Sequence, residues 1–115
     1  MSNIGNPNLV GQAFELLEQL DEAVEELAKQ GDMLAQAEYV YYRQKRDTAL
    51  RLEEEGKSGT MIGHILKGEP EVAILMREYR IAESRYRACM ERINSLKKQI
   101  TLHDNQIGRE WGRSE

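Results

Sequence analysis

Apolar residues recur along the second half of the chain at alternating steps of three and four. No Gly or Pro falls between Glu71 and Ile107. Steps that average about 3.5 residues keep one row of side chains on one side of a supercoiling helix. The pattern predicts one helix over 71–108, followed by a tail over 109–115. The row, which is the expected packing seam, consists of Val72, Leu75, Tyr79, Ala82, Tyr86, Cys89, Ile93, Leu96, Ile100, His103 and Ile107.

The first half carries a comparable row, which predicts a helix over 9–55 after an N-terminal arm over 1–8. This row consists of Val10, Phe14, Leu17, Leu20, Val24, Leu27, Gly31 and Leu34. The strict spacing then fails, because Glu38 and Lys45 fall on it. Moving back by one residue restores a row made of Ala37, Tyr41, Thr48 and Leu52. We therefore expect the helix to change register near 31–37.

A Gly-Asp pair lies inside this first helix, at Gly31 and Asp32. Asp32 is able to cap a new helix, so a break at this point is one alternative. A glycine inside a helix costs only about 1 kcal/mol, and a continuous helix is therefore the favoured prediction. A glycine on the packing row also lets a bulky partner residue approach closely.

The segment GKSGT, residues 56–60, has the order of residues that ends a phosphate-binding P-loop. A P-loop has the pattern GxxxxGK[ST] after a buried strand, so that backbone amides surround the phosphates. Arg51 stands where the first glycine of that pattern would be, and the preceding RLEEE is charged and typical of a helix. The sequence therefore argues against a nucleotide site.

Residues 56–70 instead predict a turn between the two long helices. We expect Gly56 to end the first helix in the left-handed conformation. We expect Thr60 to cap a short helix over 61–67, and Pro70 to open the second long helix. The fold class predicted is all-α, with one helical domain over the whole chain.

A turn of this length predicts that the long helices fold back into an antiparallel, coiled-coil-like hairpin. If the hairpin is centred on the turn, residues whose numbers add up to about 126 are neighbours. This rule places His103 beside Glu22 or Glu26, where a carboxylate would hydrogen-bond the imidazole ring.

The chain has more apolar helix surface than one seam can bury. The cluster Tyr39-Val40-Tyr41-Tyr42 covers every side of its helix, because consecutive residues lie about 100° apart. Further apolar residues fall beside the main rows: Leu16, Met33, Met76, Ile81 and Met90. We therefore expect two hairpins to pair into a four-helix bundle dimer, or several into a higher oligomer.

Charge is unevenly distributed behind the net value of −4. Residues 1–38 hold eight acids against Lys29 alone, a net charge of −7, whereas residues 39–115 hold fifteen bases against twelve acids, a net charge of +3. Such asymmetry fits segments that lie against each other, and also nucleic-acid contact or acidic mimicry. No apolar run approaches the roughly 18 residues that span a bilayer. We expect a soluble cytoplasmic protein without membrane contact.

Catalytic chemistry has little support in the residues. There is no HExxH motif and no Glu-x-x-His repeated on two helices, so a metal site lacks its ligands. Cys89 is the single cysteine, and we predict that it is a core residue. We predict that His103 is a buried histidine whose hydrogen bonds are satisfied. We expect no catalytic residue, cofactor or metal.

One candidate binding surface combines aromatic and basic residues near the middle of the chain. It consists of Tyr39, Tyr42, Arg43, Lys45 and Arg46. Tyrosines can stack nucleic-acid bases while neighbouring cations hold phosphates. Interleaved acids such as Asp47, and the acidic chain as a whole, argue for a solvated or interface-facing surface instead.

Two further candidate surfaces are acidic and apolar. The acidic one consists of Glu15, Glu18, Glu22 and Glu25, which is either a mimic of a phosphate strand or an ordinary solvated helix face. The apolar one lies on the short helix and consists of Met61, Ile62, Ile65 and Leu66. These residues either plug the end of the hairpin or form an exposed docking site.

Several stretches share a pattern: Glu55-Gly56-Lys57, then Lys67 to Ala73 with the sequence KGEPEVA, then Ala82 with Tyr86. Over roughly residues 45–100 the chain resembles small, largely uncharacterised all-helical proteins encoded by bacteriophages and prophages. In that family an EGK-type turn, a short apolar helix and a second long helix follow one another. The resemblance implies a setting in DNA recombination or host takeover.

We therefore expect a non-enzymatic, phage-type protein-interaction module that binds itself and a host or phage protein. Its expected role is that of an accessory factor or inhibitor of a nucleic-acid-processing or defence complex. Direct nucleic-acid binding through residues 39–46 and the second long helix is the first alternative. A structural coiled-coil spacer is the second.

Overall fold

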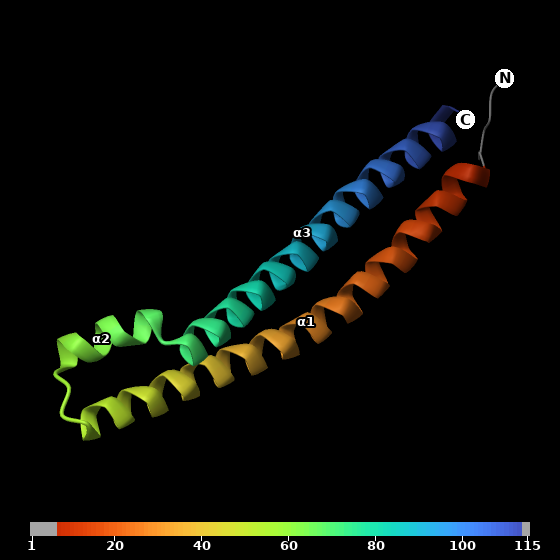
Figure 1. The fold of residues 1–115 in the computed structure, drawn as a ribbon. Helices are drawn as coiled ribbons and strands as arrows, with labels where there is room; N and C mark the ends of the chain where they lie inside the picture. Colours follow the sequence, from red (N-terminus) through yellow and green to blue (C-terminus); the bar gives the residue numbers. More distant parts are fainter. Residues whose placement is uncertain (1–6, 114–115) are drawn as a thin grey trace. The chain divides into compact units, whose positions relative to one another are not determined.

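The computed structural model describes residues 7–113, and these form three helices without a strand. Helix α1 spans Pro7–Glu54, the short helix α2 spans Gly59–Gly68, and α3 spans Pro70–Arg113 (Figure 1). The predicted all-α class is confirmed. Helix α3 continues five residues past its expected end, so most of the predicted tail is helical. The remainder of the predicted arm and tail lies outside the described residues.

Contacts divide the chain into two units, each of which contains a piece of α1 and a piece of α3. The terminal unit comprises residues 1–28 and 88–115, and the turn unit comprises residues 29–87. In each unit α1 runs antiparallel to α3, as a hairpin requires. In the terminal unit the side chain of Gln12 meets that of His103, and in the turn unit Gln44 meets Glu71.

The core of the terminal unit is aliphatic. The side chains of Leu16 and Ala23 on α1 pack with Ile93 and Leu96 on α3, and all four are buried. Leu20, Leu27 and Ile100 cover this cluster from its sides. A small alanine on α1 thus packs with large aliphatic residues on α3 in this seam.

The core of the turn unit is aromatic and partly polar. Its buried residues are Tyr41, Thr48, Leu52, Val72 and Ala82. The Tyr41 ring stacks on the Tyr79 ring at 5.7 Å between centroids, with Tyr42 at 6.1 Å from Tyr79. Gln44 donates from Nε2 to Thr48 Oγ1 at 3.1 Å and to Glu71 Oε2 at 3.1 Å. The amide of Gln44 therefore ties α1 to the start of α3.

The turn is built as the sequence predicts at Gly56 but not at Thr60. Gly56 has φ 82°, and the bonds Lys57 N to Leu52 O and Gly56 N to Glu53 O close the end of α1. This is a Schellman cap, which needs the left-handed conformation that glycine adopts at no steric cost. The absence of a strand before this segment removes the context of a P-loop among the described residues.

Helix α2 begins earlier than predicted, because Ser58 and not Thr60 caps it. The Ser58 hydroxyl accepts a hydrogen bond from Met61 N at 3.2 Å, and Thr60 lies inside the first turn. Pro70 opens α3 as expected. Its missing N–H needs no partner at that position.

The predicted register of α1 is wrong over its first half. Phe14, Leu17 and Val24 are exposed by 65, 45 and 51%, whereas their neighbours Leu16 and Ala23 are buried. A single row with strict steps of four and three points inward, and it needs no change of register near 31–37. This row is Leu9, Ala13, Leu16, Leu20, Ala23, Leu27, Gln30, Leu34, Ala37, Tyr41, Gln44 and Thr48.

Helix α1 is continuous through Gly31 and Asp32, as predicted. A Cβ atom on Gly31 would lie 3.4 Å from Cε1 of Tyr86. The glycine therefore does allow a bulky partner to approach, on the part of α1 that belongs to the turn unit.

The predicted pairing of α1 with α3 is also displaced. Contacting residues have numbers that add up to about 115–120, as in the pairs Gln12 with His103 and Gly31 with Tyr86, instead of about 126. His103 consequently meets Gln12 and not Glu22 or Glu26. The displacement arises because α2 leads back along the last turns of α1, so that α3 starts beside Gln44 and not beside the end of α1 (Figure 1).

Candidate interaction surfaces

The basic–aromatic surface, which we define as Tyr39, Tyr42, Arg43 and Arg46, lies on α1 in the turn unit. These four side chains are exposed and line one open hollow of about 540 Å³. They fall together because positions three and four apart share a side of a helix. The hollow offers two aromatic rings and two guanidinium groups to a ligand.

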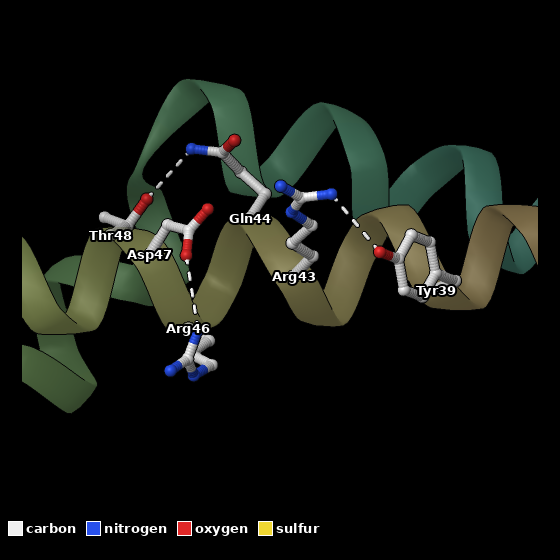
Figure 2. A network of polar contacts seen from close by, with 6 residues as sticks. All are labelled: Tyr39, Arg43, Gln44, Arg46, Asp47 and Thr48. Carbon is white, nitrogen blue, oxygen red and sulfur yellow. Dashed lines mark hydrogen bonds and ion pairs between the residues drawn. The ribbon is translucent and has the colours of Figure 1, made fainter.

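Bonds within α1 hold part of this surface in place. Arg43 Nη1 donates to the Tyr39 hydroxyl at 3.2 Å, one turn earlier on the helix. Arg46 Nη1 lies 3.8 Å from Asp47 Oδ1, so one of the two cations is partly neutralised. Figure 2 shows both contacts beside the Gln44–Thr48 bond. Exposed pairs of this kind stabilise by roughly 0–1 kcal/mol, and the guanidinium groups stay available to an anion.

Lys45, which the sequence groups with these residues, is not among the residues that line this hollow. It is half-buried, and its Nζ lies 5.7 Å from the centroid of the Tyr41 ring. Tyr41 in turn packs against Tyr79. Burial raises the pKa of Tyr79 above its usual range, and the carboxylates of Glu38 and Glu83 raise it further. Lys45 is thus part of the aromatic core.

The acidic–apolar surface lies on α1 in the terminal unit. Phe14, Leu17 and Val24 each follow a seam position by one residue, and they form a second row with helical spacing. One residue further round the helix is the predicted acidic row, and all of its members are exposed: Glu15, Glu18, Glu22 and Glu25. The structure thus places an apolar row directly beside an acidic one, which the sequence prediction missed by assigning the apolar row to the core.

The short helix α2 contains no buried residue. Met61 is exposed, whereas Ile62, Ile65 and Leu66 are half-buried. Apolar side chains of α2 therefore cover the hairpin end only in part and leave apolar area open.

A cationic groove lies on α3 in the turn unit, on the long helix that the nucleic-acid alternative named as a whole, but this groove was not singled out from the sequence. The groove has a volume of about 440 Å³ and is lined by Ala73, Met76, Arg77, Arg80, Ile81 and Ser84. The sequence signal was available, since Met76 and Ile81 fall beside the seam row and two arginines stand between them. A smaller hollow in the terminal unit is lined by Lys97, Lys98, Thr101 and Leu102.

Groups with catalytic or metal-binding chemistry do not converge. Nε2 of His103 lies 3.1 Å from Gln12 Oε1 on α1, and Nδ1 lies 3.2 Å from Gln99 O on α3. Both ring nitrogens therefore lie within hydrogen-bond distance of a partner on one of the two helices. Cys89 is half-buried in the seam row. Within residues 7–113, no three His, Cys, Asp or Glu side chains gather closely enough to hold a metal ion. Over the same residues, no helix has a stretch long and apolar enough to cross a membrane.

Comparison of the chain with protein-family models, with curated proteins and with solved structures found no match. The resemblance to phage proteins therefore stays a prediction.

Proposed function

We propose that this chain is a non-enzymatic, phage-type protein-interaction module that assembles with itself and binds a further host or phage protein. In this proposal it acts as an accessory factor or inhibitor of a nucleic-acid-processing or defence complex. One observation carries the proposal. Twelve large apolar side chains of the described residues are exposed by 44 to 65%, from Phe14 on α1 to Trp111 on α3.

The exposed area supports self-association. The chain exposes 8608 Å², whereas a globular monomer of 13.3 kDa would expose about 6,400 Å². The excess of roughly 2,000 Å² is larger than the approximately 800 Å² that each partner buries in a standard interface. Among the described residues no large side chain is fully buried. A dimer that forms a four-helix bundle is the simplest assembly that covers these rows.

The α2 row supports binding of a second protein. Met61, Ile62, Ile65 and Leu66 lie on a ten-residue helix without a buried residue, at the end of the turn unit. Apolar patches on soluble proteins that remain open in this way are typical of docking sites.

The test is affinity capture from nuclease-treated bacterial lysate, at low and high salt, with the wild type and two variants. Met61→Glu places a charge on the α2 row, and Leu50→Glu places the same charge on an exposed apolar residue of α1. We expect a protein captured in near-stoichiometric amount by the wild type and by Leu50→Glu, and lost with Met61→Glu. Assembly without any captured protein would instead indicate a structural spacer.

Direct nucleic-acid binding is a second candidate, which the basic–aromatic surface favours. Its rings and guanidinium groups line one hollow, as single-strand-binding surfaces require. Affinity for a single-stranded oligonucleotide would then fall steeply between about 50 and 200 mM salt. Arg43→Ala would weaken it, and Lys57→Ala, in the turn, would not. Equal and salt-insensitive binding by both variants would reject this candidate.

A further inference from the structure

We propose that the acidic–apolar surface of one copy docks on the cationic groove of α3 in a second copy. This inference rests on the proposed self-association and names the two surfaces that make it. The apolar row of one copy, with Phe14 and Leu17, would cover Met76 and Ile81 of the other. The acids beside that row would face Arg77 and Arg80.

The two surfaces match in length and in periodicity. The row from Val10 to Val24 rises about 21 Å along α1, and the groove from Ala73 to Ser84 rises about 16 Å along α3. The groove residues recur at steps of three and four, and so does the row, in which Asp21 stands between Leu17 and Val24. Two helices with such rows pack as knobs into holes. In a four-helix bundle, each hairpin needs an outer helix face that packs on the other hairpin, in addition to the faces that pack within the hairpin.

Charge selects this pairing over the other contacts available to the acidic–apolar surface. In residues 7–28 there are six acids and no base, whereas residues 70–87 hold four arginines against three glutamates. Pairing two copies of α1 would set one acidic row against another, and like charges across an interface suppress association. Opposite charges across the same interface favour it.

The groove offers more large apolar side chains than the other basic hollow on α3. The hollow in the terminal unit has one large apolar side chain, Leu102, beside Lys97 and Lys98. The groove has two, Met76 and Ile81, and Ile74 beside it is exposed by 57%.

A two-fold dimer would make the contact twice. In such a dimer the same pair of surfaces meets in both directions, so each copy supplies one row and one groove.

The experiment is sedimentation equilibrium on five full-length chains, one of which is the wild type. Glu18→Lys/Glu22→Lys reverses the acidic row, Arg77→Glu/Arg80→Glu reverses the groove, and the combined chain carries all four changes. We expect each reversal to weaken the dimer at least about tenfold, because it sets like charges together in both contacts. We expect the combined chain to recover most of the affinity. Glu53→Lys/Glu54→Lys changes the net charge by the same amount and sign as Glu18→Lys/Glu22→Lys, on an exposed part of α1, so it is the control for that reversal and should leave the dimer unchanged.

The outcomes separate this inference from the proposal beneath it. A wild type that stays monomeric up to millimolar concentration rejects both the self-association and the pairing. A wild-type dimer that neither reversal weakens rejects the pairing alone.

Disulfide trapping gives a second measurement. In a Cys89→Ser background, chains with Phe14→Cys are mixed with chains with Ile81→Cys and oxidised gently. We expect a mixed disulfide dimer to dominate over the one formed with Leu102→Cys chains. Equal yields from both mixtures would overturn the pairing even if the wild type dimerises.

Discussion

The terminal unit and the turn unit use the same helix pairing but build their seams from different side chains. Leucine, isoleucine and alanine fill the terminal seam. In the turn unit, stacked tyrosines and the hydrogen-bonded amide of Gln44 take that place. All five tyrosines of the chain lie in the turn unit, whereas its single Phe and single Trp lie exposed in the terminal unit.

The two kinds of seam contribute in different ways to the stability of the helix pair and to its register. An aliphatic seam stabilises a helix pair but fixes its register weakly, since one leucine replaces another at little cost. The bond from Gln44 Nε2 on α1 to Glu71 Oε2 on α3 is directional and depends on the register of the two helices. Within the turn unit, this bond therefore helps to fix how α1 and α3 align.

Breaking the terminal seam should have the largest effect. Ile93→Asp with Leu96→Asp places two charges in buried positions. Loss of the aliphatic contacts alone costs about 2–5 kcal/mol per residue, and the buried charges add to it. We expect loss of helicity in far-UV circular dichroism and loss of assembly. Leu102→Asp, at an exposed position of the same helix, should change stability by less than about 0.5 kcal/mol. A folded, unchanged oligomer of the double variant would contradict the seam.

Truncating the aromatic seam should affect the turn unit more than the terminal unit. Tyr79→Ala removes a ring that packs on Tyr41 and Tyr42. We expect a loss of about 2–4 kcal/mol in urea unfolding, against less than about 1 kcal/mol for Tyr79→Phe, which keeps the ring. Amide hydrogen exchange should show the loss of protection mainly over residues 29–87. An equal loss of amide protection in both units would show that the Tyr79 ring does not stabilise the turn unit more than the terminal unit.

Changing Gly56, which caps α1 in the turn unit, should reduce stability by a smaller amount, and changing the next residue, Lys57, should have no measurable effect. Gly56→Ala forces a side chain into the left-handed conformation and should cost about 1 kcal/mol in thermal unfolding. Lys57→Ala should change stability by less than about 0.5 kcal/mol. Titration with ATP should give no signal for either protein. Binding that disappears with Lys57→Ala would restore the P-loop interpretation of GKSGT.

Alkaline pH should distinguish the two units by a small effect. The pKa of Tyr79 is raised in the folded chain, so the unfolded chain loses this proton at lower pH. At a pH between the pKa of Tyr79 in the unfolded chain and its raised pKa in the folded chain, the unfolded state binds fewer protons than the folded state. The free energy of unfolding therefore falls as the pH rises above the usual pKa of tyrosine. Urea unfolding between pH 9 and about 11 should show a smaller loss for Tyr79→Phe than for the wild type. An identical pH profile for both proteins would reject the role of this residue.

The inward row of α3 follows from the sequence because one row alone has strict spacing there. Helix α1 carries two adjacent rows with the same period, and the choice between them cannot be made from size. Leu17 equals its buried neighbour Leu16 in size, and Val24 is larger than its buried neighbour Ala23, yet Leu17 and Val24 are exposed. The opposite helix decides, since Ile93 and Leu96 already fill the space that a larger residue on α1 would take.

The surfaces were harder to predict than the helices, for a related reason. Residues such as Tyr39 and Arg43 meet within one helix, so spacing was enough to group them. The contact of Lys45 with Tyr41 could not be predicted from spacing, because it depends on the core of the turn unit. The alignment of α1 with α3 depended on where α2 lies, and a count of turn residues does not contain that information.

Synthesis of the chain delivers the two units in a fixed order. Gln44 and Glu71 are 27 residues apart, whereas Gln12 and His103 are 91 apart. A ribosome that adds about 5–20 residues per second would take roughly 4–15 s to proceed from Leu16 to Ile93. During that interval the first half of α1 has no α3 to pack against, and the turn unit is completed just before the interval ends, at residue 87. The six acids of residues 7–28 give the first half of α1 a charge that repels other nascent copies, which protects its two apolar rows until the matching part of α3 has been made.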